Sequence, residues 1–359
     1  MQDITSDWIQ FLARQGARFS ASAPSEVTGF EGVAERGGER GDDPGSELIP
    51  LSDLGLIAAS GAEAANFLHN QLTNDVLHLP EDQARLAGYC TPKGRLLATM
   101  LIWRSGDDIL LQLPREILPA ILKRLQMYLL RTKASLRDVS ADTVLLGLTG
   151  PAAAAALAPD FPAAAALAPY AKCDSAAGSL MRLADANGVP CYLWQASPEA
   201  AIAAWPRLRE TLTPAPAAAW RLAQIRAGIP QVVGATQELF VPQMLNYDVI
   251  EGINFRKGCY PGQEIVARSQ YLGKQKRRML AATLPGLEAP APGTEVFSSA
   301  DPGQPCGVIV NAAAAPDGRA ECLVEIKTAA LEQGTVHLDS AQGPALVFGA
   351  LPYPLPEPA

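Results

Sequence analysis

Apolar positions in the first part of the chain recur at spacings typical of helices and of strands. Residues 8–19 carry a helical apolar repeat and predict a short amphipathic helix. The apolar runs 48–51 and 56–59 predict strands. A helical repeat over 64–72 follows them, with Ser60 and Glu63 at the spacing of a capping box. The pattern therefore predicts strands followed by a helix that leads into a polar turn.

Strands and helices continue to alternate through the middle of the chain. Short runs of apolar residues bounded by turn residues predict strands at 84–90, 95–103, 108–113, 143–148, 180–183 and 189–194. Helical repeats predict helices at 117–130 and 198–212. The Ala/Pro-rich stretch 151–169 predicts helix and loop, since alanine favours helices but specifies packing poorly. This mixture predicts an α+β fold.

Beyond Lys276 the pattern changes to short apolar runs broken by Gly and Pro. The runs are 279–284, 295–297, 306–310, 320–326 and 345–347. Such a series is typical of a small antiparallel β-barrel. Near the other end of the chain, residues 35–45 are rich in Gly, Glu and Arg and predict a mobile loop.

Length and charge narrow the class of protein. A chain of 359 residues predicts two or three domains, and 48% hydrophobic residues are ample for burial. The net charge of -8 argues against a surface that coats nucleic acid, although a local basic group occurs at Lys274, Lys276, Arg277 and Arg278.

The spacing of the cysteines and the lengths of the apolar runs limit which metal sites and which cellular compartments are expected. The six cysteines show no CxxC or CxxH spacing, so no metal site or iron-sulfur cluster held by this chain alone is expected. The first residues lack a signal-peptide pattern, and no apolar run approaches twenty residues. These features predict a cytoplasmic protein with reduced thiols and no membrane partner. Nucleotide-loop, dinucleotide, zincin and hydrolase-elbow motifs do not occur.

The segment 257–264, KGCYPGQE, concentrates candidate chemistry around Cys259. Gly258 and Gly262 permit backbone angles closed to other residues, and Lys257 supplies a cation that favours thiolate. Residues 265–268 predict a helix that begins at the Gly/Gln/Glu turn 262–264, which would place its positive N-terminal end near the sulfur. Two interpretations stay open: a reactive cysteine with a lowered pKa, or a tight loop whose cysteine fills a small apolar hole.

Other polar residues admit a structural interpretation first. Asn74 and Asp75 follow a helix in a turn, where such side chains usually cap local backbone. His69 is placed on the polar side of that helix and predicts a solvated histidine. The turn 91–95 predicts a solvated hairpin.

The run 254–268, NFRKGCYPGQEIVAR, resembles the signature of the YgfZ family of folate-binding, iron-sulfur-related proteins, within the aminomethyltransferase (glycine-cleavage T-protein) superfamily. The resemblance extends to 220–230, 240–246, 61–68 and 71–76, and covers roughly residues 48 to 285. It implies a three-domain, aminomethyltransferase-like ring around a central cavity, with a C-terminal antiparallel β-barrel. The implied parts are an N-terminal helix and loop at 1–47, two α+β domains at 48–140 and 141–275, and the barrel at 276–359.

The resemblance also implies a site for tetrahydrofolate or a derivative. Cys259 is implied as the catalytic residue. The implied folate-binding residues are Asn74, Asp75, Gln243, Asn246, Lys257, Gly258, Tyr260, Gly262, Gln263, Glu264, Arg277 and Arg278. Among them, Arg277 is expected to bind the folate carboxylates, with Arg278 beside it. Amides at Gln243 and Asn246 are expected at the pterin edge.

One departure from the superfamily bears on activity. True aminomethyltransferases carry a catalytic aspartate on the strand after the corresponding glycine turn, whereas residues 96–99 here read LLAT. Without that carboxylate, glycine cleavage is disfavoured. The resemblance then implies an accessory protein for iron-sulfur cluster assembly or repair in client enzymes, including tRNA-modifying ones. A folate-dependent one-carbon transferase or demethylase using Asp75 or Glu264 stays open, as does an interaction module that contacts tRNA while Cys259 serves structure.

Overall fold

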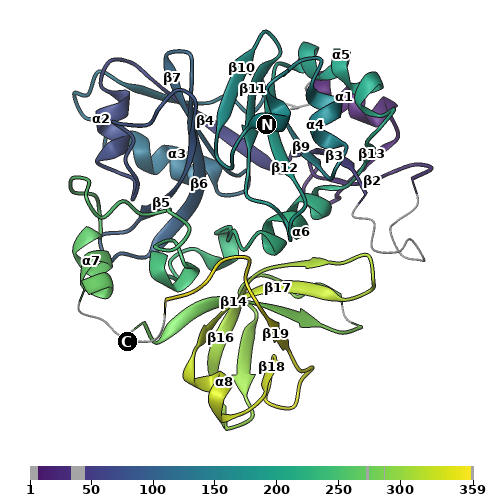
Figure 1. Cartoon of the computed structure of the whole chain (residues 1–359). Coiled ribbons are helices and arrows are strands. Elements are labelled where there is room, and N and C mark those ends of the chain that lie inside the picture. Colours follow the sequence, from purple (N-terminus) through teal and green to yellow (C-terminus); the bar gives the residue numbers. More distant parts are fainter. Residues whose placement is uncertain (1–6, 34–44, 272–274, 287, 357–359) are drawn as a thin grey trace. The chain divides into compact units, whose positions relative to one another are not determined.

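The computed structural model describes residues 7–33, 45–271, 275–286 and 288–356 (Figure 1). Its fold is mixed α+β, as predicted. The chain forms two compact units, each built from separate stretches of sequence. The first comprises residues 1–64, 79–84 and 101–223, and the second 65–78, 85–100 and 224–359. The division into four parts at residues 47, 140 and 275 stays a prediction.

One part of the first unit is built on a six-stranded sheet. Its order is β10 (Lys172–Ser175), β11 (Gly178–Arg182), β12 (Cys191–Ala196), β9 (Val144–Thr149), β3 (Glu47–Pro50) and β13 (Thr213–Pro214). Only the short β13 pairs in parallel with its neighbour. Helices pack their apolar sides on this sheet in one core: α1 (Asp7–Arg14), α4 (Ala153–Leu157), η1 (Ala164–Ala166) and α5 (Pro198–Leu208). A hairpin of β1 (Ala17–Phe19) and β2 (Val27–Phe30) joins the same core.

The first unit also contains an antiparallel sheet built around β4 (Leu54–Ser60). On one side β4 pairs with β7 (Asp108–Pro114), which pairs with the end of β6 (Leu96–Ser105). On its other side lies β8 (Ser135–Asp138). Helix α3 (Leu118–Gln126) packs against β4 and β8 with Leu118, Ile121 and Leu125 buried.

The second unit carries the segments that the sequence singled out. It contains helix α2 (Ala64–His69), strand β5 (Ala84–Cys90), the start of β6, the end of α6 (Ala217–Arg226), the short turns η2 (Gly234–Thr236) and η3 (Pro242–Leu245), and α7 (Gln263–Tyr271). The hairpin between β5 and β6 closes through a hydrogen bond from Thr91 N to Arg95 O.

The C-terminal part of this unit is a curled antiparallel sheet (Figure 1). Its order is β18 (Val336–Leu338), β15 (Glu295–Ser298), β16 (Asp301–Ala314), β17 (Ala320–Lys327), β14 (Arg277–Leu284) and β19 (Val347–Gly349), with helix α8 (Ala329–Gln333) between β17 and β18. A hydrogen bond of 2.9 Å from Leu346 N to Val336 O links β18 to the residue before β19. The structure therefore shows a half-barrel, and full closure stays a prediction.

Local signals explain where the observed elements depart from the predicted ones. The first helix ends at Arg14, because Gly16 takes a left-handed φ of 84° and the chain turns into β1. The helix predicted over 117–130 ends at Gln126. The capping box was wrong: Ser60 Oγ bonds to Asp108, and Glu63 accepts from Lys133 N. Most of the loop predicted at 35–45 lies outside the described residues.

No helix formed by the described residues has the length and apolar character needed to cross a membrane.

Candidate functional site

The Cys259 loop begins with a turn that Asn254 organises. The Asn254 side-chain oxygen accepts hydrogen bonds from the backbone N–H groups of Arg256, at 2.8 Å, and Lys257, at 3.1 Å. Asn254 N in turn donates to Thr73 O at 3.0 Å. An Asn that folds local backbone in this way is common in turns. The interpretation of the sequence missed this role, although Asn254 opens the signature run.

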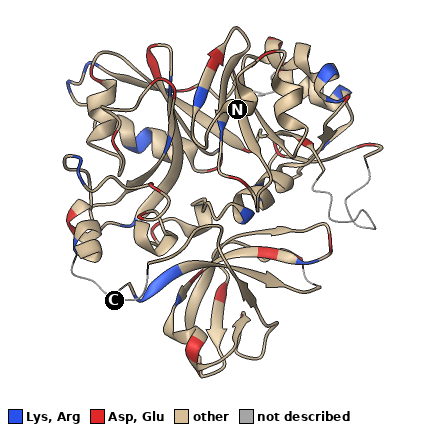
Figure 2. Cartoon of the chain, viewed as in Figure 1, with Lys and Arg blue, Asp and Glu red and all other residues tan. Residues whose placement is uncertain are grey.

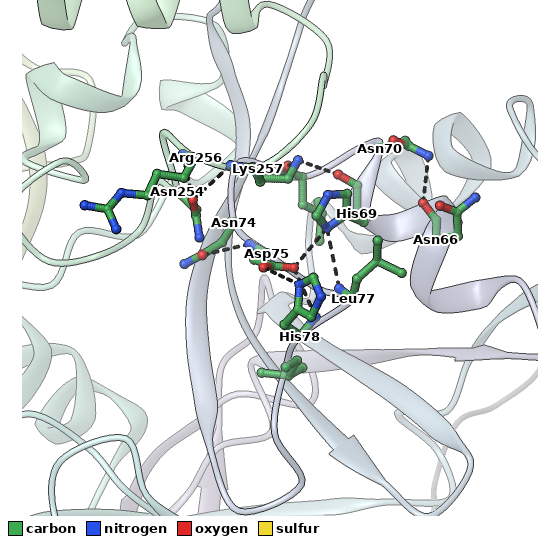
Figure 3. A network of polar contacts seen from close by, with 12 residues as sticks. Asn66, His69, Asn70, Asn74, Asp75, Leu77, His78, Asn254, Arg256 and Lys257 are labelled. Carbon is green, nitrogen blue, oxygen red and sulfur yellow. Dashed lines mark hydrogen bonds and ion pairs between the residues drawn. The ribbon is translucent and has the colours of Figure 1, made fainter.

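Lys257 holds the loop against helix α2 (Figure 3). Its side chain is buried and donates to His69 O and to Leu72 O, the latter at 2.8 Å. The ammonium nitrogen also lies 4.6 Å from the centre of the Tyr260 ring. Burial lowers the pKa of Lys257 to about 8, against the opposing attraction of Asp75 and Cys259. Lys257 therefore stays mostly protonated at pH 7, and its charge stabilises carbonyl groups at the C-terminal end of α2.

The two glycines of the loop differ. Gly262 has a φ of 83°, and a Cβ there would lie 2.5 Å from Gly94 Cα and from Thr91 O, so the prediction of a special backbone is confirmed. Gly258 is not among the described residues of positive φ, and a Cβ there would meet only His69 Nε2, at 3.8 Å. The conformational argument for Gly258 was wrong.

Helix α7 begins at Gln263, within the turn 262–264 where its start was predicted, and carries Glu264 in its first turn. Gln263 N donates to Tyr260 O at 3.1 Å, so the loop runs directly into the helix. The Tyr260 ring is buried, and burial raises the pKa of its hydroxyl.

Cys259 differs from the other five cysteines in exposure. All six thiols are free, and Cys259 alone is exposed. Burial raises the pKa of Cys90, Cys191 and Cys322 to about 12. It also raises the pKa of half-buried Cys173 and of buried Cys306. Thiolate chemistry near neutral pH is therefore disfavoured at those five positions.

Beside the loop, Asp75 joins two histidines (Figure 3). Asp75 Oδ1 lies 3.1 Å from His69 Nδ1, and Oδ2 lies 2.9 Å from His78 Nδ1. His69 is only 7% exposed, so the prediction of a solvated histidine was wrong. Burial, together with the Lys257 cation, lowers the pKa of His69. Burial opposes ionisation of Asp75, but hydrogen bonds from His78 outweigh it and lower the pKa of that carboxyl.

The side chain of Asn74 forms hydrogen bonds with backbone groups of the same unit. Its Nδ2 donates to Leu86 O and to Glu251 O, both at 2.7 Å, and its Oδ1 accepts from Asp75 N at 2.8 Å. The prediction of local capping is therefore confirmed for Asp75, whose Oδ1 also accepts from His78 N at 3.1 Å, whereas two of the three Asn74 bonds reach backbone distant in sequence. A folate contact from Asn74 stays a prediction, and it would compete with three existing hydrogen bonds.

Two other amide side chains implied by the resemblance, Gln243 and Asn246, are buried, and only the nitrogen of each amide forms a hydrogen bond. Gln243 Nε2 donates to Val266 O at 2.7 Å, and Asn246 Nδ2 donates to Met279 O at 2.8 Å. The side-chain oxygens of both, Gln243 Oε1 and Asn246 Oδ1, lack a hydrogen-bond partner within the described part of the chain. Buried acceptors of this kind usually find a donor in water or in a ligand.

Arg277 and Arg278 of the basic cluster are the first two residues of β14, and both are paired with carboxylates of the chain; Figure 2 marks the start of this strand in blue. Arg277 binds both oxygens of Glu325, with Nη2 to Oε2 at 2.8 Å. Arg278 binds Asp248 through two hydrogen bonds of 2.7 and 3.0 Å and also donates to Gln243 O. Lys274 lies outside the described residues. Anchoring of folate by Arg277 and Arg278 stays a prediction, and a ligand carboxylate would have to displace an existing partner.

Residues 96–98, where a transferase would carry its aspartate, are buried and apolar in β6. The two carboxylates that an alternative transferase could use lie elsewhere. Asp75 is held by His69 and His78, and Glu264 is exposed on α7. Within the described ranges, no three His, Cys, Asp or Glu side chains form a group that could hold a metal ion.

Comparisons with known proteins agree on the fold. Residues 45–182 match the GCVT N-terminal domain. The tRNA-modifying protein YgfZ of Colwellia psychrerythraea is 34% identical over 238 residues, which is 66% of this chain and 71% of the relative. The protein of the same name from Cronobacter sakazakii is 29% identical over 315 residues, which is 86% of this chain and 94% of the relative. The crystal structure of the glycine cleavage system aminomethyltransferase T from Bartonella henselae has a TM-score of 0.75 at 18% identity, covering 95% of each chain.

Proposed function

The chain belongs to the YgfZ family, and from that premise we propose that it is a cytoplasmic, folate-binding accessory protein. In this proposal it supports the assembly or repair of iron-sulfur clusters in client enzymes, including tRNA-modifying ones. The observation that carries the proposal is the exposure of a single thiol, Cys259, in a loop that a buried lysine and a left-handed glycine hold in place.

Cys259 is proposed as the residue that meets the client. Its sulfur is accessible, whereas burial disfavours thiolate at the other cysteines. A soft, exposed sulfur suits nucleophilic attack, thiol exchange or direct contact with a cluster. Lys257 and Gly262 act as positioning residues, because they fix the backbone on either side of the sulfur.

Part of the implied folate site fits the described residues. The unpartnered oxygens of Gln243 and Asn246 are acceptors for the N–H donors at the edge of a pterin, but both side chains are fully buried, so binding would require the residues around them to move. When bound, tetrahydrofolate would supply a reduced pterin able to carry a one-carbon unit. The guanidinium groups of Arg277 and Arg278 fit less well, since each is already paired with a carboxylate. We include in the proposal a ring-like domain arrangement and closure of the C-terminal barrel, as in the superfamily.

Calorimetric titration with tetrahydrofolate under anaerobic conditions tests the ligand. We expect saturable binding by the full chain, weakened by Gln243→Leu. If Arg277 does anchor the ligand, Arg277→Ala should cost about 1.5 to 3 kcal/mol of binding free energy, the usual loss of a charge-assisted hydrogen bond. Absence of any binding heat at millimolar folate would overturn the folate part of the proposal.

Complementation tests the cellular role. In cells that lack the protein, we expect an iron-sulfur client enzyme to lose activity and the wild-type chain to restore it. Cys259→Ser should fail to restore it, whereas Cys173→Ser, which alters a half-buried thiol, should restore it. Full restoration by Cys259→Ser would show that the loop serves shape alone.

A further inference from the structure

The loop that follows helix α3, residues 127–131, presents apolar side chains to solvent. Met127 is 59% exposed, Tyr128 48% and Leu130 84%. Among the described residues eight large hydrophobic side chains are exposed, and three of them lie within the four positions 127–130. Single exposed hydrophobic residues need no explanation, but a cluster marks a surface that another molecule covers.

Both ends of this loop are firmly held. On one side Gln126 Nε2 donates to Leu136 O at 3.0 Å. On the other, Lys133 N donates to the Glu63 carboxylate. Lys133 O approaches Gly61 so closely that a Cβ on that glycine would lie 2.5 Å away. A loop that is already ordered loses little conformational entropy when it binds, which favours affinity.

The segment of sequence that contains the loop is basic in an acidic protein, although the Glu63 carboxylate accepts the Lys133 N–H. Residues 117–137 contain five basic residues and no acidic one, while the whole chain has a net charge of -8. The five are Lys123, Arg124, Arg131, Lys133 and Arg137. Arg137 pairs with Asp108 at 3.0 Å. The other four form no ion pair with a carboxylate of the described residues, and because Arg124 Nε is buried, Lys123, Arg131 and Lys133 make up the exposed basic rim; Figure 2 marks the basic positions on α3 in blue. An apolar centre with a basic rim is the complement of an apolar hollow ringed by carboxylates.

We propose that residues 127–131, with this basic rim, are the docking site for a partner protein that offers an acidic rim around an apolar pocket. The inference rests on the proposed function in one respect: the partner is taken to be a client enzyme. Met127 and Leu130 would fill the pocket, Tyr128 would contribute a large rigid contact, and the basic side chains would steer the encounter.

Other occupants fit less well. Nucleic acid attracts the basic rim but offers no pocket for the aliphatic chains of Met127 and Leu130, since RNA-binding surfaces rely on aromatic stacking and phosphate contacts. An anionic membrane would also face the remaining surface of an acidic chain. A second copy joined through a two-fold axis would set this basic rim against itself.

In-cell photocrosslinking tests the proposal on the full chain. Tyr128 is replaced by p-benzoylphenylalanine, the cells are irradiated, and the adducts are identified by mass spectrometry. We expect an adduct with an identified iron-sulfur enzyme, mapped to an apolar pocket lined by Asp and Glu. With that enzyme purified, Leu130→Ser should raise Kd at least tenfold, and Lys133→Glu should slow association most strongly at low salt. The matched control is Val347→Ser, which removes from β19 a hydrophobic side chain that is 57% exposed.

Other outcomes count against the inference. Adducts only with tRNA, only with a second copy, or with no macromolecule would overturn it. So would binding to vesicles of phosphatidylglycerol and phosphatidylcholine that Leu130→Ser abolishes, or a loss of affinity in Val347→Ser as large as in Leu130→Ser. If the Leu130→Ser variant fully restores client activity in cells, the proposed docking site is refuted and the proposed function is unaffected. If folate binding is absent and Cys259→Ser restores the client, the proposed function falls, and the crosslink still reports on the loop.

Discussion

Replacing Arg278 with methionine separates a structural role for this residue from a role in binding folate. The Arg278 and Asp248 side chains are 8% and 4% exposed, and they share two hydrogen bonds of 2.7 and 3.0 Å. Methionine fills similar volume but leaves the Asp248 carboxylate buried without its cation. Breaking a buried pair in this way costs about 3 to 5 kcal/mol of unfolding free energy. Gln243 O loses its donor from Arg278 as well.

Urea denaturation measures that loss, with the slope of the transition checked so that the midpoints can be compared. The control is Arg319→Met, which breaks an exposed pair with Asp317 and should leave the midpoint of the transition nearly unchanged. Combining Arg278→Met with Asp248→Leu should recover most of the stability, because no buried charge is then left alone. A loss below about 1 kcal/mol in Arg278→Met would refute this reasoning. If folate affinity nevertheless fell in that variant, Arg278 would be a ligand anchor.

The remaining predictions concern the Cys259 loop and its neighbours. Cys259 should react with iodoacetamide near neutral pH faster than the other five thiols, followed by peptide mass spectrometry; slower alkylation there would contradict a reactive cysteine. The lowered pKa of His69 means that below pH 6.5 the unfolded chain takes up a proton that the folded chain does not, so the free energy of unfolding should fall with decreasing pH by at most about 1.4 kcal/mol per unit. His69→Asn should remove that part of the slope, and superimposable pH profiles would count against it. Gly262→Ala should destabilise by more than about 1 kcal/mol through its left-handed φ and the clash with backbone, whereas Gly286→Ala, with a φ of 66° and open space, should cost less; equal losses would argue against the clash. Because residues 96–98 carry no carboxylate, the chain should form no methylene-tetrahydrofolate in a reconstituted glycine-cleavage assay, and robust product formation would overturn that view.

The spacing of apolar residues, and the glycine and proline residues at turns, were enough to predict most strands and the fold class. The strands at 84–90 and 144–149 are examples, since their apolar runs end at glycine- or proline-containing turns. Helix ends were less predictable: the repeat of α3 continues to Leu130, yet the helix stops at Gln126. Apolar residues past that point face solvent, so periodicity alone could not distinguish core from exposed surface.

The sequence was enough to single out residues of the candidate site, but not the groups with which those residues form hydrogen bonds and ion pairs. The sequence singled out Lys257 for its effect on the sulfur of Cys259, but its hydrogen bonds go to the carbonyls of His69, at the end of α2, and of Leu72, in the turn after it. The two arginines that begin β14 were interpreted as available to a ligand, whereas Glu325 and Asp248 bind them. His69 was read as solvated because its burial depends on segments distant in sequence. Tertiary pairing of this kind leaves no local pattern.

The same long-range bonds bear on when the site forms during synthesis. Lys257 is separated by 188 and 185 residues from its two acceptors, His69 at the end of α2 and Leu72 in the turn after it, and the unit that contains them is assembled from three stretches of chain. At ribosomal rates of about 5 to 20 residues per second, α2 emerges roughly ten seconds or more before the lysine that caps it. Contacts of such separation also form late and slowly. The polar turn after α2 therefore lacks the hydrogen bonds from Lys257 during that interval, and the Cys259 loop cannot take its final form until Lys257 has been made.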